Sequence, residues 1–265
     1  MVLAADDRTA KLWNLDGTLL GTLKDHQETV TEVVFSPDGQ TIATASDDKT
    51  AKLWNLDSTL LATLEGHELK INSISFSPDG QTIATVSNDK TVKLWNLDST
   101  LRKTLTDHNE IVYFVSFSPD GKYFATTGRN GVFILWDKYG DKKLEIQGHE
   151  SQIYSISFSP DSTLIATSGK DKTAKIWSLE GYELGTLKGH SEPIDHITFS
   201  PDGQTLATAS RDDYVILWTL NLDRIKEFRK LWILDLEGLR EKGCDWVNNY
   251  LKNNSNNGTN DLCKP

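Results

Sequence analysis

The chain has little cysteine, methionine or proline, with two, one and seven of these residues among 265. Cys244 and Cys263 are too few for a disulfide framework in a chain of this size. No apolar run approaches the ~18 residues that a membrane-spanning helix needs, so we expect no membrane partner. The first residues, Met-Val-Leu-Ala-Ala-Asp-Asp, are too acidic and too short an apolar start for a secretory signal. These absences predict a cytoplasmic protein that does not depend on disulfides.

Positive charge is also in short supply, with 28 basic against 38 acidic residues and a net charge of −10. A surface with this charge repels a phosphate backbone, so we do not expect nucleic acid as a partner. Hydrophobic residues make up 37% of the chain, which is ordinary for a soluble globular protein of one large or two modest domains.

A period of 41 residues dominates what is present. Tryptophan occupies the same place in six successive periods, at Trp13, Trp54, Trp95, Trp136, Trp177 and Trp218. The same spacing separates the histidines His26, His67, His108, His149 and His190. Proline repeats as well, always within Ser-Pro-Asp, at Pro37, Pro78, Pro119, Pro160 and Pro201. Because three residue types of unrelated chemistry share one spacing, the sequence indicates a repeat array.

Each period predicts four short β-strands. In one complete period we expect strands at 30–35, 41–46, 50–56 and 60–64, separated by turns rich in Pro, Asp, Gly and Ser. Four short strands cannot bury both faces of their sheet alone, whereas sheets stacked radially can. Five periods are complete, and residues 2–23 precede them as a partial period without its inner strand.

The repeated motifs resemble those of the WD-repeat (WD40) family. The resemblance covers roughly residues 1–229 and rests on Ser-x-Asp turns, Leu-Trp strand ends and the pairs Gly66-His67, Gly148-His149 and Gly189-His190. Trp136-Asp137 keeps the literal Trp-Asp dipeptide, and Asp25 and Asp107 replace the glycine before histidine. The resemblance implies an all-β fold, a β-propeller of four-stranded antiparallel blades, with about six blades represented and the first one incomplete.

Histidine, serine and aspartate at fixed places in the repeat allow two interpretations. A catalytic triad would occur once, beside an oxyanion hole on a strained turn, and the chain has no G-x-S-x-G motif. Here the pattern is complete three times and partial twice, at Gly128/Asn130 and at Gly169/Asp171. We therefore predict no catalytic residues, and interpret the pattern as a buried hydrogen-bond chain that rigidifies each blade. In the WD-repeat family such tetrads are structural, and they map onto His26, Ser46, Asp48, Trp54, onto His67, Ser87, Asp89, Trp95 and onto His190, Ser210, Asp212, Trp218.

Metal and cofactor sites are not predicted. The periodic histidines would be distributed one per blade, and His196 stands alone. The spacing of Cys244 and Cys263 matches no zinc motif, and no glycine-rich phosphate loop is present. We expect no cofactor.

The period fails after Leu222. A fourth strand of the last blade is expected at 224–228, and the 41-residue pattern then ends. We assign 1–229 to the propeller, predict a short α-helical C-terminal tail at 230–252 and expect 253–265 to be disordered. The tail resembles that of bacterial, especially cyanobacterial, WD-repeat proteins, many of which carry an upstream nucleotide-binding signalling domain.

The resemblance also indicates where a partner would bind. In WD-repeat proteins, one position of the inner strand and the position before the tetrad aspartate line the top of the channel. Tyrosine supplies rigid contact area, and arginine binds carboxylates with two hydrogen bonds. The alternative is a solvated rim whose charges have no function. The resulting candidates for partner binding are Tyr113, Tyr154, Arg129, Lys170, Arg211, Asn72 and Asp47.

These observations favour a non-enzymatic scaffold that binds a protein or peptide on the top face. One alternative is the separated sensor, or C-terminal lobe, of a larger signalling ATPase. Another is a propeller enzyme with a site at the channel mouth, which would need a cluster of acid, base or metal ligands that is not periodic.

Overall fold

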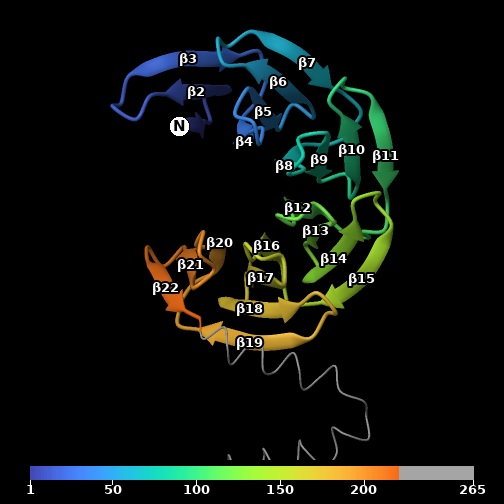
Figure 1. Ribbon diagram of the computed structural model, residues 1–265, viewed down its shortest axis with the longest axis vertical. Coiled ribbons are helices and arrows are strands. Elements are labelled where there is room, and N and C mark those ends of the chain that lie inside the picture. Colours follow the sequence, from blue (N-terminus) through green and yellow to red (C-terminus); the bar gives the residue numbers. More distant parts are fainter. Residues whose placement is uncertain (221–265) are drawn as a thin grey trace, which may run out of the picture. The chain divides into compact units, whose positions relative to one another are not determined.

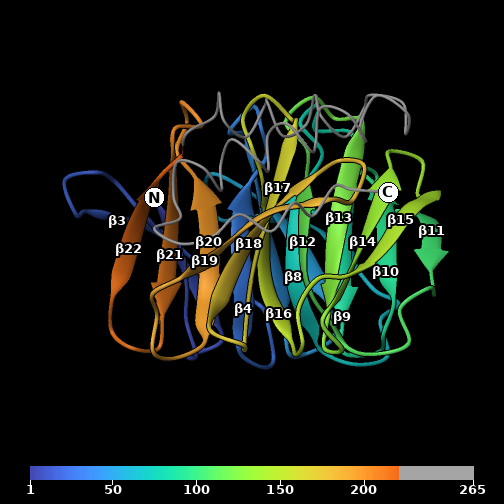
Figure 2. The ribbon, with the colours of Figure 1, turned by 90° about the horizontal axis from the view of Figure 1, so that it is seen from below.

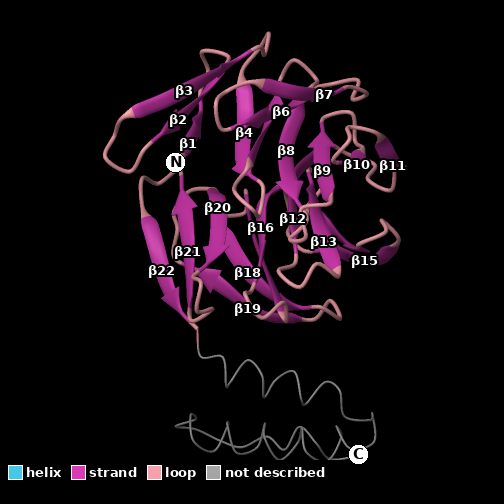
Figure 3. Ribbon diagram, turned by 45° about the horizontal axis from the view of Figure 1, so that its top comes forward, coloured by secondary structure: helices cyan, strands magenta, loops and turns pink. Residues whose placement is uncertain are grey.

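The structure is a computed structural model that describes residues 1–220. Every regular element in those residues is a β-strand, and the strands belong to one compact unit, Met1–Thr219 (Figure 3). No helix of residues 1–220 has both the length and the apolar character needed to cross a membrane. The all-β prediction is confirmed for this region. The helical tail predicted at 230–252 and the disorder predicted at 253–265 lie outside the described residues.

The strands form six antiparallel sheets, numbered in chain order. The first contains β1 (Val2–Ala4), β2 (Thr9–Trp13) and β3 (Leu19–Lys24), and the second contains β4 (Val30–Phe35), β5 (Thr41–Ser46), β6 (Ala51–Asn55) and β7 (Leu60–Leu64). The third contains β8 (Ile71–Phe76), β9 (Thr82–Ser87), β10 (Val92–Asn96) and β11 (Leu101–Leu105), and the fourth contains β12 (Val112–Phe117), β13 (Tyr123–Gly128), β14 (Val132–Asp137) and β15 (Lys142–Gln147). The fifth contains β16 (Ile153–Phe158), β17 (Leu164–Gly169), β18 (Thr173–Ser178) and β19 (Glu183–Lys188), and the sixth contains β20 (Ile194–Phe199), β21 (Thr205–Ser210) and β22 (Val215–Thr219).

The predicted four-stranded antiparallel unit is confirmed in the second to fifth sheets. The first sheet has three strands, which correspond to the second, third and fourth strands of the others, so the prediction of an incomplete first blade is also confirmed. The sixth sheet has three strands within the described residues. Its fourth strand, predicted at 224–228, lies outside them.

Ser-Pro-Asp turns connect the first and second strands of the complete periods. In the second sheet, the hydroxyl of Ser36 donates to Asp38 Oδ1 over 2.6 Å and accepts from the Thr41 N–H over 2.9 Å. Gly39 closes the turn with φ +69°, a conformation that L side chains rarely adopt. The composition of each turn therefore fixes where its two strands end and begin.

Within the unit Met1–Thr219, the sheets follow one another along an arc (Figure 1). The strands β4, β8, β12, β16 and β20 lie on the inner side of the arc, and β7, β11, β15 and β19 lie on the outer side. Every sheet runs between two faces (Figure 2). We name them the histidine-loop face, which carries the loops before the inner strands, and the proline-turn face, which carries the Ser-Pro-Asp turns.

The core lies between successive sheets. Between the second and third sheets, for example, Leu53 and Leu64 pack with Ile71, Ile83 and Trp95. Trp54, Trp95 and Trp136 are at most 2% exposed, so each buries nearly all of a large aromatic surface. The tryptophan period of the sequence is thus a packing period: Trp54, Trp95, Trp136 and Trp177 each pack against residues of the preceding sheet.

Candidate functional site

Buried hydrogen-bond chains link the histidine loop of a sheet to its second and third strands. In the third sheet, His67 Nδ1 lies 2.7 Å from Asp89 Oδ2, and His67 Nε2 lies 2.8 Å from Thr85 Oγ1. The indole N–H of Trp95 donates to the same threonine oxygen over 2.9 Å. An ionised carboxylate only accepts hydrogen bonds, so Nδ1 of the imidazole carries a proton and donates it to Asp89.

A threonine supplies the hydroxyl of each hydrogen-bond chain. This corrects the sequence-based assignment of the hydroxyl to Ser46, Ser87 and Ser210. Ser46 Oγ instead donates to the Glu28 carbonyl and accepts from the Asp48 N–H. The fifth sheet, predicted to hold a partial network, is complete because Thr167 supplies the hydroxyl. Four sheets therefore contain the full chain: His26, Thr44, Asp48, Trp54; His67, Thr85, Asp89, Trp95; His149, Thr167, Asp171, Trp177; and His190, Thr208, Asp212, Trp218.

Two sheets depart from the pattern. In the fourth sheet, His108 and Trp136 share Thr126 in the usual way, but no hydrogen bond joins Asn130 to His108 among the described residues. In the first sheet, Leu3 stands where the others have threonine, and the buried Trp13 Nε1 has no partner within residues 1–220. The threonine oxygens are buried and shared by an indole and an imidazole, an arrangement that suits a structural tie between strands.

Replacing Asp48 with alanine should lower the free energy of unfolding by ~1–3 kcal/mol, because it removes the partner of four donors, one of them the Thr50 N–H. The carboxylate accepts from the His26 ring, the Gln27 N–H and the Thr50 hydroxyl. Burial opposes its ionisation, but these hydrogen bonds outweigh that effect and lower the pKa of Asp48. Denaturant unfolding measures the loss. Asp57→Ala is the matched control, since Asp57 holds a similar turn through Thr59 on the surface, and an equal cost there would refute the role of the network.

The candidate partner residues on the fourth to sixth sheets lie at the histidine-loop face. The rings of Tyr113 and Tyr154 meet edge to face, with centroids 5.8 Å apart. The Arg211 guanidinium lies over the Tyr154 ring at 5.1 Å, and its Nε lies 3.0 and 3.1 Å from the two carboxylate oxygens of Asp195. Arg129 acts on the Tyr113 hydroxyl, whose pKa is raised mainly by burial and lowered in part by this cation.

The remaining candidates differ in their availability. Arg129 and Lys170 are exposed, and neither forms an ion pair with another residue of the described region. The side-chain amide of Asn72 donates to Asn88 Oδ1 and to the Val112 carbonyl, so it connects the third sheet to the fourth. Asp47 lies 3.6 Å from Lys70. The structure therefore brings Tyr113, Tyr154 and Arg211 into contact and leaves Asn72 and Asp47 on other sheets.

A second layer of inner-strand residues was not predicted. Glu32 accepts a hydrogen bond from the Ile74 N–H over 2.8 Å, and its counterparts Ser73 and Ser155 bond the next sheet in the same way. Burial raises the pKa of Glu32 to about 7. Phe114 and His196 occupy the same repeat position, and their rings meet at 5.8 Å. The sequence contained a signal for this layer, because the same repeat position alternates between serine, at Ser73 and Ser155, and the larger Glu32, Phe114 and His196.

Two family models match the chain. The one described as IFT122 first beta-propeller matches residues 1–186, and the one described as WD domain, G-beta repeat, matches residues 181–219. The chain belongs to the WD-repeat β-propeller family. No curated protein matches it. WD-repeat propellers generally mediate interactions between proteins and typically act as non-enzymatic scaffolds, so the predicted class of function is supported at this level.

A metal ion in this WD-repeat chain would need several His, Cys, Asp or Glu side chains gathered at one place within residues 1–220. No group of three or more His, Cys, Asp or Glu side chains in that region could hold an ion together. Four of the five repeat histidines use both ring nitrogens in hydrogen bonds within their own sheets, and His108 uses one. The ring nitrogens that form these hydrogen bonds therefore stabilise the fold.

Proposed function

We propose that this WD-repeat domain is a scaffold that binds an acidic, aromatic-containing protein segment on its histidine-loop face. The observation that carries the proposal is the contact of Tyr113 with Tyr154, with Arg211 stacked on the second ring. Asp195 holds Arg211 in place and neutralises it. Arg129 and Lys170 flank the tyrosines as exposed cations and supply the charge that would recognise a carboxylate.

The chemistry of these groups favours a peptide over a small reactive substrate. The two tyrosines offer rigid apolar contact area, and an aromatic side chain of the ligand can pack on them at low entropic cost. Arg129 and Lys170 lie on two successive sheets, so they would contact successive carboxylates along an extended segment. We further propose a cytoplasmic location. The bacterial, cyanobacterial-type origin of the tail and its link to a signalling ATPase stay predictions from sequence resemblance.

The test is binding of a fluorescein-labelled peptide of alternating glutamate and phenylalanine, followed by anisotropy. We expect the triple variant Tyr113→Ala, Tyr154→Ala, Arg129→Glu to bind at least about tenfold more weakly, which corresponds to ~1.4 kcal/mol. Lys49→Glu, at an exposed turn of the second sheet, is the control for net charge. Equal affinity of the wild type and the triple variant would show that the site is elsewhere.

A further inference from the structure

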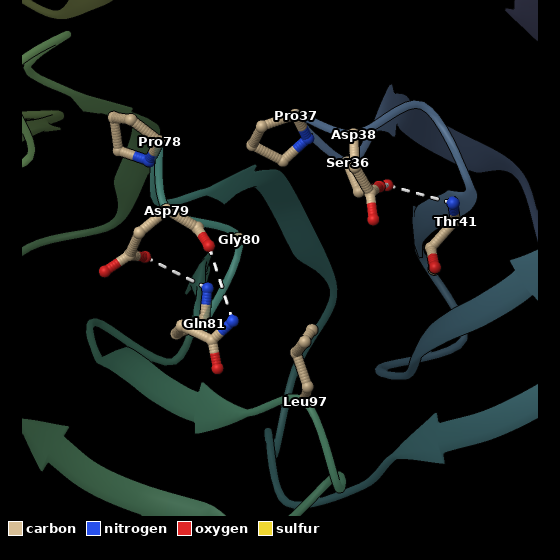
Figure 4. Close-up of a pocket in the computed structure, with 9 residues that line it drawn as sticks. All are labelled: Ser36, Pro37, Asp38, Thr41, Pro78, Asp79, Gly80, Gln81 and Leu97. Carbon is tan, nitrogen blue, oxygen red and sulfur yellow. Dashed lines mark hydrogen bonds between the residues drawn. The ribbon is translucent and has the colours of Figure 1, made fainter.

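A second surface lies on the opposite, proline-turn face, between the second and third sheets. Two cavities of about 350 and 330 Å³ share Thr41 and Leu97 and together form one groove. Figure 4 shows the first cavity, with Pro37 and Pro78 on one side and Leu97 on the other. We call the two cavities together the proline-turn groove.

The lining of this groove combines polar residues with exposed leucines and prolines. Leu97 is 44% exposed and Leu61, which lines the second cavity, is 55% exposed. Pro37 and Pro78 are exposed beside them, and the turns that carry them are in contact, since a Cβ on Gly80 would lie 3.7 Å from Pro37 Cδ. The proline wall is therefore held in place by packing between sheets. Apolar side chains gathered in a preformed hollow are typical of an interaction site.

Acidic side chains surround these apolar residues. Asp38 and Asp79 line the first cavity and Asp98 lines the second, whereas neither cavity is lined by lysine, arginine or histidine. Each aspartate accepts the hydrogen bonds of its own turn through Oδ1, which leaves Oδ2 available. Those hydrogen bonds, from Ser36, Ser77 and Thr100 first, lower the pKa of each carboxyl, so all three are ionised at neutral pH.

Leu97 and Leu61 follow the repeat, since leucine also stands at the equivalent positions 15, 56, 179 and 220 for Leu97 and at 20 and 184 for Leu61. One period after Leu97 the sequence has Lys138, and one period after Leu61 it has Arg102. The next junction along the arc therefore carries cations where this one carries leucines. Lys138 itself acts on Asp79 and is a minor contributor to the lowered pKa of that carboxyl. The combination of leucine, proline and available carboxylates thus distinguishes this junction from the next one along the arc, whereas the preceding junction also carries leucines at the equivalent positions, Leu20 and Leu56.

We propose that the proline-turn groove binds a segment of a partner protein in which an aliphatic side chain is flanked by lysine or arginine. The aliphatic group would pack between Leu97 and the two prolines, and the flanking cations would meet Asp38, Asp79 and Asp98. The apolar part of the lining favours an aliphatic side chain in the hollow, and the carboxylates favour basic neighbours by charge complementarity. This site is independent of the one proposed on the histidine-loop face.

The test uses the full chain and a labelled peptide of alternating lysine and leucine. We expect Leu97→Lys, which copies the residue of the next repeat, to weaken binding about tenfold, and Asp79→Asn to weaken it about threefold. Leu61→Lys examines the second cavity independently, with the same expected direction. Leu97 and Leu61 are both exposed, so these variants should keep the wild-type melting temperature.

Two controls separate the groove from general attraction to an acidic protein. Asp120→Asn removes an equivalent carboxylate on the next turn of the same face and should leave the affinity within about twofold. A peptide of alternating lysine and serine keeps the charge and should bind at least about tenfold more weakly than the leucine peptide. If Asp120→Asn weakens binding as much as Asp79→Asn does, or if Leu97→Lys binds like the wild type, the proposal is wrong.

Discussion

Thr85→Val is expected to lower the free energy of unfolding by ~2–4 kcal/mol, the largest loss that we anticipate from a near-isosteric change. Valine keeps the volume and the β-branched shape of threonine but removes the oxygen that joins His67 Nε2 to Trp95 Nε1. Both groups lie in side chains that are at most 6% exposed, so water cannot replace the lost partner. Each of these two buried polar groups, left without a partner, adds its desolvation cost to the loss in the free energy of unfolding.

Urea denaturation of Thr85→Val and Ser87→Ala provides the comparison. Ser87 Oγ donates to the Leu69 carbonyl and accepts from the Asp89 N–H, so its removal should cost about 1 kcal/mol. The ratio of the two losses decides which hydroxyl belongs to the tetrad. A larger loss for Ser87→Ala than for Thr85→Val would return the assignment to the serines.

The repeat and its four strands could be predicted because they depend on local chemistry. A tryptophan, a histidine and a Ser-Pro-Asp turn recur at one spacing, and each has a local consequence for strand or turn. The hydroxyl could not be assigned in the same way. Thr44 and Ser46 are two residues apart on one strand, so both side chains point to the same face, and alternation cannot separate them. A better signal was present: threonine recurs in all five complete periods at 44, 85, 126, 167 and 208, whereas glycine replaces the serine in two of them.

Contacts between side chains on different strands and turns could not be predicted from the sequence either. Arg211 was predicted to lie at the partner face, but its ion pair with Asp195 depends on how β20 meets the turn after β21. The proline-turn groove was not predicted, because it needs the distance between turns one period apart. Residue spacing along the chain shows which residues of different repeats are equivalent. The distance between two neighbouring sheets depends instead on how their side chains pack. Both of the proposed binding surfaces lie at junctions between neighbouring sheets.

The fourth sheet is expected to make the protein sensitive to acid. His108 is 6% exposed, and burial lowers its pKa from 6.5 to about 4. Between these two pH values the unfolded chain binds the proton and the folded chain does not, so stability is fully present above pH 6.5 and is lost as the pH falls toward 4. A pKa difference of this size corresponds to ~3 kcal/mol. The fourth sheet also lacks a carboxylate beside its histidine, since Asn130 stands where Asp48, Asp89, Asp171 and Asp212 bond their histidines. Burial lowers the pKa of His26 as well, and there Asp48 opposes the effect of burial.

Asn130→Asp should therefore remove much of this acid sensitivity. A carboxylate at this position can accept the Nδ1–H of His108, because a Cβ built on Gly128 would lie 3.2 Å from that nitrogen and 2.7 Å from Asn130 Oδ1, which places the two side chains side by side. The charge would raise the pKa of His108 toward its ordinary value and shrink the difference between folded and unfolded states. The measurement is the free energy of unfolding at several pH values between 4 and 6.5, with Asn130→Ala as the control that removes the amide without adding charge. We expect a flatter profile for Asn130→Asp alone, and parallel profiles in all three proteins would mean that His108 does not govern the acid response.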